Sequence, residues 1–185
     1  MNYWFDVMQD DCYLIAADGW QASTYRIVEE KKNKDGQVTK TVDKGWTCDL
    51  VPKTLVIQRY FAAQQQAIDA LNTGLETLQS RLAEMEEEHS GEEGAFAILD
   101  KINKASINVR LKEIKNDPQS IDEEKILKQY LELLEQEAAT KKAISTAGIA
   151  LDAELLAFYP TLTQDQIKQL VVDDKLIAAI GRDIH

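Results

Sequence analysis

The chain has 185 residues, 44% of them hydrophobic, and a formal net charge of −11 at pH 7. A chain of this length can form one domain with its own core, or a small domain with a long helical projection. No apolar run approaches the roughly 20 residues that a membrane span requires, and the first residues lack the basic and apolar regions of a signal peptide. We therefore expect a cytoplasmic protein that does not contact a membrane.

Charged residues are unevenly distributed. A uniformly acidic surface repels DNA, so the net charge argues against binding of nucleic acid by the entire protein surface. The segment 101–115 nevertheless holds five basic residues and one acid. It has two open interpretations, a solvated helix face or a contact with the DNA backbone. The candidate DNA contacts are Lys101, Lys104, Arg110, Lys112 and Lys115.

Neither the cysteines nor the glutamates have the pattern of a metal site. Cys12 and Cys48 stand alone rather than in paired motifs, which favours two reduced thiols over a disulfide or a zinc site. Six glutamates fall between Glu84 and Glu93, but consecutive glutamates at a helix end point in several directions and usually face solvent. We expect no metal in this chain.

Residues 1–52 have the pattern of strands and turns. The apolar run Cys12–Ala16 has the length of a strand, and two later segments alternate in period two around the turn signal Asp35-Gly36. They predict a hairpin with a basic tip at Lys31, Lys32 and Lys34. Because about fifty residues of hairpin close only a marginal core, this region should either dock on helices or belong to a larger sheet domain.

A long helix is predicted after Pro52, which disfavours helix in the preceding residue and can open one after it. Thr54 is the expected cap. Apolar residues then recur in steps of four and three over four heptads, with Gln64 as the one polar member. This seam either meets a partner helix or is filled by a second helix of the same chain. The predicted partner interface is Ile57, Phe61, Gln64, Ile68, Leu71, Leu75, Leu78, Leu82 and Met85.

A second long helix should follow. Gly91 and Gly94 break the first, short helices extend to Pro118, and Ser120 with Glu123 has the pattern of a capping box. The similar lengths of the two helices suggest an antiparallel hairpin with the short helices near its tip. The predicted fold is mainly α: a long antiparallel, coiled-coil-like helical hairpin with short helices, plus a small N-terminal β-hairpin region.

The predicted domains are the β-hairpin region at 1–52, the helical hairpin at 53–159, and short C-terminal helices at 160–185. In the last, Thr163 and Gln166 form another capping-box pattern, and Asp173 can cap a following helix. A helix-turn-helix that reads DNA is the less favoured interpretation, because the second helix offers few side chains that read bases.

Catalytic and cofactor-binding patterns are missing from the sequence. No glycine-rich phosphate loop occurs, and of the two histidines His185 is the last residue, so neither it nor His89 makes a convincing base. Carboxylates are plentiful, but their spacing singles out no pair. The residues alone describe a helical interaction module that carries a small sheet, with no catalytic, cofactor-binding or metal-binding residue.

Six segments in order, "YLIAADGW", "YRIVEEKKNKDG", "DKGWTCDLVPKTLVIQRYFAAQQQAIDALNTGLETL", "EEEHSGEEGAF", "NVRLKEIK" and "YPTLTQDQIKQLVVDDK", carry a resemblance to a known family. Together they resemble the carboxyl-terminal region of the modification (M) subunit of type I restriction-modification systems, an adenine-N6 DNA methyltransferase. The resemblance covers about Asp11 to Lys175.

The resemblance implies that the chemistry lies elsewhere. Family members carry an upstream domain that binds S-adenosylmethionine and holds the target adenine with an Asn-Pro-Pro-aromatic motif. The prolines here are Pro52, Pro118 and Pro160, so this chain has no Pro-Pro pair and no catalytic residue to carry over. We expect a carboxyl-terminal fragment or split gene product that is not an enzyme by itself, with residues 1–52 as the tail of a missing catalytic domain. Family members also continue beyond the position of His185.

The resemblance also implies partners. In the family, the carboxyl-terminal helices of M pack against the long helices of the specificity (S) subunit, in a complex with the restriction (R) subunit and DNA. The heptad seam is the kind of surface that such packing needs, and an exposed seam could also self-associate. The alternative is a free-standing coiled-coil scaffold or chaperone-like protein-interaction module, whose gene need not have S and R genes as neighbours.

Overall fold

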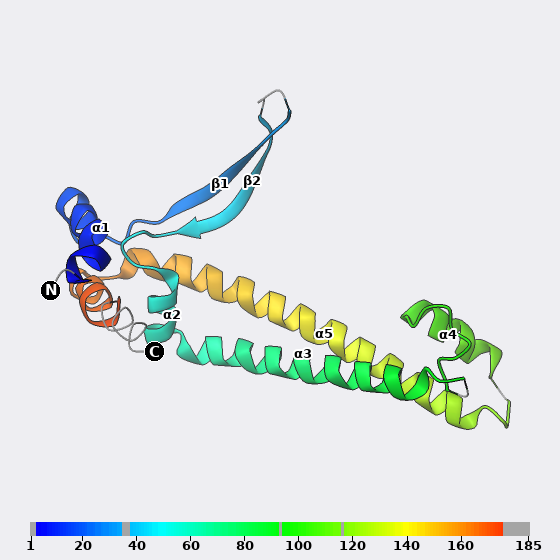
Figure 1. Ribbon diagram of the computed structural model, residues 1–185. Helices are drawn as coiled ribbons and strands as arrows, with labels where there is room; N and C mark the ends of the chain where they lie inside the picture. The colour runs from blue at the N-terminus through cyan, green and yellow to red at the C-terminus, as the bar shows by residue number, and fades with distance from the viewer. Residues whose placement is uncertain (1–2, 35–37, 93, 116, 176–185) are drawn as a thin grey trace. The chain divides into compact units, whose positions relative to one another are not determined.

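The computed structural model describes residues 3–34, 38–92, 94–115 and 117–175 (Figure 1). The protein is mainly helical and carries one small antiparallel β-hairpin, as predicted. Its helices and strands are α1 (Tyr3–Asp18), β1 (Tyr25–Lys32), β2 (Val38–Thr47), α2 (Lys53–Tyr60), α3 (Ala62–His89), α4 (Lys104–Glu113), α5 (Ile121–Phe158), η1 (Tyr159–Thr161), α6 (Gln164–Lys168) and η2 (Gln169–Lys175). Two compact units result. The first unit is Met1–Gln65 with Ile149–His185, and the second unit is Gln66–Gly148.

The prediction of a strand at Cys12–Ala16 is wrong, because these residues belong to α1. Met8 and Asp11 are buried and Ile15 is half-buried, and this i, i+3, i+7 spacing is that of one helix face rather than of a strand. The helix stops at Gly19, which has a φ of 74° and donates its N–H to the Ile15 carbonyl at 2.9 Å. A left-handed glycine at this position is a common helix end.

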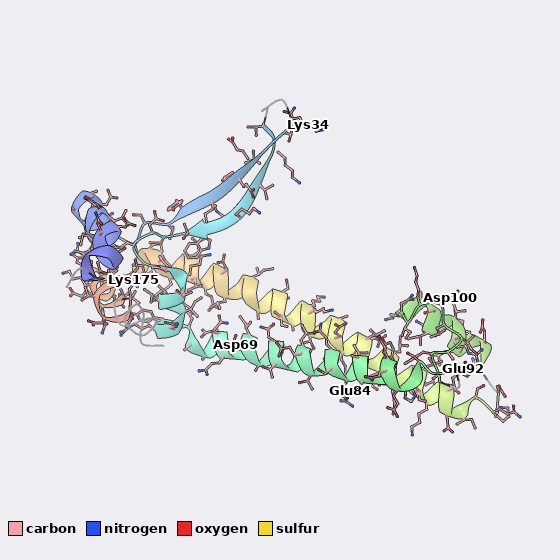
Figure 2. The ribbon with its side chains drawn as sticks, in the orientation of Figure 1. Lys34, Asp69, Glu84, Glu92, Asp100 and Lys175 are labelled. Atoms are coloured by element: carbon pink, nitrogen blue, oxygen red, sulfur yellow. The ribbon has the colours of Figure 1, made fainter. Side chains whose placement is uncertain are left out.

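The strands β1 and β2 form the predicted hairpin, in which Val28 lies opposite Asp43. An extra residue enters β2 where Gly45 adopts a φ of 96°, as expected for a bulge. Most of the described side chains of the hairpin are exposed, including Lys34 near its tip (Figure 2). The predicted turn at Asp35-Gly36 lies outside the described residues.

The base of the hairpin docks on helices of the first unit through Trp46, which is buried. Its indole Nε1 donates to Asp152 Oδ2 at 2.8 Å, and Lys53 Nζ pairs with Oδ1 of the same carboxylate at 2.6 Å. Lys53 Nζ also lies 3.8 Å from the centroid of the Trp46 ring, and Tyr159 meets that ring edge-on at 5.0 Å between centroids. One tryptophan thus joins β2 to α2, α5 and η1.

The predicted first long helix is interrupted. Helix α2 begins at Lys53, next to Pro52, and the N-cap has no side-chain hydrogen bond, so the expected cap at Thr54 is wrong. Phe61 leaves the helical region with φ −126° and ψ 23°, and α3 starts one residue later. The Phe61 ring packs edge-on against Phe158 at 5.4 Å. This aromatic contact accompanies a break that periodicity does not encode.

In the second unit, α3 and α5 run antiparallel side by side (Figure 1). Helix α3 ends at His89, as the glycines predicted. A Cβ at Gly94 would collide with the His89 carbonyl oxygen, so the turn after α3 needs a glycine there. The core of this unit joins α3, α4, α5 and the turns between them. It consists of Leu82, Phe96, Ile107, Ile114, Leu127, Tyr130 and Leu133.

Of the predicted capping boxes, one forms and one does not. Thr163 and Gln166 cap α6 reciprocally, whereas the Ser120 hydroxyl donates to Asp117 and Glu123 binds Arg110. Tertiary ion pairing at Glu123 replaces the local bond. Asp173, expected to cap a further helix, lies inside the π-helix η2. The segment proposed as the second helix of a helix-turn-helix falls largely outside the described residues.

Candidate partner interface

The predicted seam is divided by the fold into three parts. In the first unit, Ile57 and Phe61 are half-buried and Gln64 is exposed. In the second unit, Leu82 is buried, with Leu78 and Met85 packed around the same core. The stretch between them, formed by Ile68, Leu71 and Leu75, is half-buried. The row of side chains is therefore continuous in sequence but unequal in exposure.

The end of the seam near Leu82 is filled by the chain's own α5. Leu82 shares its core with Leu127 and Tyr130, and the Tyr130 hydroxyl donates to Glu86 on α3. Burial, followed by the bond to Glu86, raises the pKa of Tyr130 well above its ordinary value. Leu78, Leu82 and Met85 thus pack on the chain's own residues.

The middle of the seam faces a different kind of surface. Across from it, α5 offers Thr140, Ile144 and Ala147, all half-buried. Two polar contacts to Glu137 lie between the apolar core and the middle of the seam. Lys141 pairs with Glu137 at 2.7 Å, and Gln79 Nε2 donates to Glu137 Oε1 at 3.1 Å. These bonds lower the pKa of Glu137. Two of these three α5 residues, Thr140 and Ala147, are small or polar, and they cover leucines less fully than large apolar side chains do.

The predicted basic strip is partly neutralised. Arg110 binds Glu123 with two nitrogens, at 2.6 and 3.0 Å, and this bond raises its pKa. Lys104 pairs with Glu135 at 2.8 Å. Lys101, Lys112 and Lys115 are exposed. Three of the five candidate DNA contacts are therefore exposed without an ion pair to α5. The other two, Lys104 and Arg110, form ion pairs with glutamates of α5.

Sequence reasoning missed the polar contacts that join distant segments of the first unit. Lys175 Nζ pairs with the buried Asp11 at 2.7 Å, and Arg59 binds Asp174 with two bonds of 2.7 Å. The Tyr159 hydroxyl donates to the Val51 carbonyl at 2.8 Å. No local pattern predicts such pairs, because the partners lie more than a hundred residues apart along the chain.

No protein-family model matches the chain, and neither a curated protein nor a solved structure matches it. Among the residues that the structure describes, no helix is long and apolar enough to cross a membrane. Likewise, the described part of the chain contains no group of three or more histidine, cysteine or acidic residues that could hold a metal ion.

Proposed function

We propose that this chain is the carboxyl-terminal assembly region of the M subunit of a type I restriction-modification DNA adenine methyltransferase. It acts by packing against the specificity subunit, and it has no methyltransferase activity by itself. The proposal rests first on the resemblance of six ordered segments to that family. The structural observation that supports it best is the half-buried row Ile68, Leu71 and Leu75 on α3.

This row supports binding of a partner helix for a physical reason. Leucine and isoleucine side chains lose stabilisation when they stay partly in water, by about 25 cal/mol for each Å² of apolar surface left uncovered. A helix of another chain can cover this row with knobs-into-holes packing. Leu78, Leu82 and Met85 already pack in the internal core, so we exclude them from the proposed interface. The part of the seam that we propose for the partner is the row within residues 68–75.

The test is light scattering during size-exclusion chromatography, with the chain alone and with the cognate specificity subunit. We expect a stoichiometric complex that Leu71→Asp weakens at least tenfold. The matched control is Ala70→Asp, because Ala70 is exposed and lies outside the row. Circular dichroism of both variants checks that they remain folded.

Three outcomes separate the alternatives. Loss of the complex with Leu71→Asp alone supports the proposed row. Loss with Ala70→Asp alone moves the contact to the outer face of α3. If the wild-type chain forms no complex with the specificity subunit, the assembly role fails and a free-standing scaffold becomes the better explanation.

A further inference from the structure

A hollow of about 170 Å³ lies in the first unit, where the C-terminal end of α1 meets the base of the hairpin. Sites for small molecules usually have roughly 300–1,000 Å³, so this hollow has room for one long side chain rather than for a whole cofactor. Its walls include Leu14, Asp18, Gln21, Tyr25, Asp49 and Leu50.

The charge of the hollow is negative, because its lining holds two aspartates and no lysine, arginine or histidine. Asp18 and Asp49 are both exposed, and neither forms an ion pair with another described residue. Lys175 contacts the Leu50 carbonyl at 3.3 Å but pairs with Asp11 instead. Helix α1 ends at Asp18, and the carbonyl groups of a helix's last turn add partial negative charge. The hollow therefore attracts a positively charged group.

The walls also suit the uncharged part of a basic side chain. Leu14 is half-buried and Tyr25 is 50% exposed, so an aliphatic stem can cover them. The Tyr25 hydroxyl donates to Asp49 Oδ1 at 2.6 Å, and a carboxylate can accept further hydrogen bonds. A guanidinium stacks on aromatic rings and matches carboxylates with its fork of donors, whereas an ammonium is a compact point charge. These walls favour arginine over lysine.

We propose that this hollow binds an arginine side chain of a partner protein. The guanidinium meets the carboxylates of Asp18 and Asp49, and the aliphatic stem packs on Leu14 and the Tyr25 ring. The site goes beyond the assembly role and does not depend on it, because none of these residues belongs to the α3 row. A divalent metal ion is the competing occupant, but the described part of the chain holds no group of three acidic, histidine or cysteine residues that could bind one.

The test is an NMR titration of the full isotope-labelled chain with the peptide acetyl-Gly-Arg-Gly-amide. We expect saturable shifts of the backbone amides of Asp18, Gly19 and Asp49. Binding should weaken about tenfold with Asp18→Asn or with Asp49→Asn, because each substitution removes a charge-assisted hydrogen bond. Tyr25→Leu, which removes the stacking surface, should also weaken binding. A peptide with citrulline in place of arginine keeps the shape without the charge and should not bind measurably, and a lysine peptide should bind more weakly than the arginine peptide.

The matched control variant is Glu154→Gln, which neutralises an exposed carboxylate of the same unit outside the hollow. It should bind the arginine peptide like the wild type, and circular dichroism checks that every variant remains folded. Absence of saturable shifts, equal binding of the citrulline peptide, or an equal loss with Glu154→Gln overturns the proposal. So does a titration in which Mg²⁺ or Ca²⁺ shifts the same amides at lower concentration than the arginine peptide.

Discussion

Each of the two units is stabilised internally by a different kind of contact. The second unit has an apolar core whose members recur at helical spacing along α3 and α5, with Leu82, Leu127 and Tyr130 at its centre. The first unit also buries apolar residues, but polar contacts between distant segments join its elements: Trp46 with Asp152, Tyr159 with Val51, and Lys175 with Asp11. Apolar residues at regular helical spacing thus form the core of the second unit, whereas individual polar contacts join the elements of the first unit.

The largest expected effect is in the repetitive core. Leu127 is completely buried, so Leu127→Ala should lower the free energy of unfolding by about 2–5 kcal/mol through lost apolar contact and a residual cavity. Urea unfolding followed by circular dichroism measures it. Ile121→Ala, at a 63% exposed position of the same helix, is the control and should cost less than about 0.5 kcal/mol. A similar loss in both variants would contradict the central place of Leu127.

An intermediate effect is expected when a charge pair of the first unit is broken. Lys175→Met leaves the Asp11 carboxylate, 5% exposed in its side chain, without its partner. Removing one partner of a buried pair is strongly destabilising, and because the Lys175 side chain is itself 23% exposed we expect about 2 kcal/mol by the same measurement.

The double variant Asp11→Leu, Lys175→Met removes both charges of this pair and should recover most of that loss. If the double variant does not recover the free energy of unfolding, the pair contributes through the geometry of its hydrogen bonds rather than through charge compensation.

The smallest effect is expected at the base of the hairpin. Trp46→Phe keeps an aromatic ring but removes the hydrogen bond to Asp152, which should cost about 1 kcal/mol because the accepting carboxylate is half-exposed. Lys53→Met removes the other bond to the same carboxylate and serves as the comparison. Both are measured at pH 7 by thermal unfolding.

The effect of Trp46→Phe should depend on pH. Burial raises the pKa of Asp152, but the bonds from Lys53 and Trp46 outweigh it, so the pKa lies below its ordinary value. The stabilisation is therefore present above the ordinary pKa of an aspartate, about 4, and is lost as the pH falls through the lower folded-state pKa. The difference between Trp46→Phe and wild type should shrink as the pH falls below the ordinary pKa of an aspartate. A constant difference would show that packing, not the bond, matters.

The failures of sequence reasoning fall where distant contacts decide local structure. The strand expected at Cys12–Ala16 is helix because one helix face buries Met8 and Asp11. The predicted cap pair at Ser120 and Glu123 does not form because Glu123 binds Arg110 instead. In both places a tertiary contact, rather than the local sequence signal, decided the local structure.

The sequence by itself determined the helical character, the end of α3 at His89, the β-hairpin and the heptad row on α3, because each depends on residues within one or two turns of each other. Only the tertiary structure decided which part of that row is covered. Leu82 is buried and Leu75 is half-buried, although the two lie seven residues apart and occupy equivalent places in the repeat. Coverage depends on which side chains α5 places opposite, and periodicity along one helix carries no information about the facing helix.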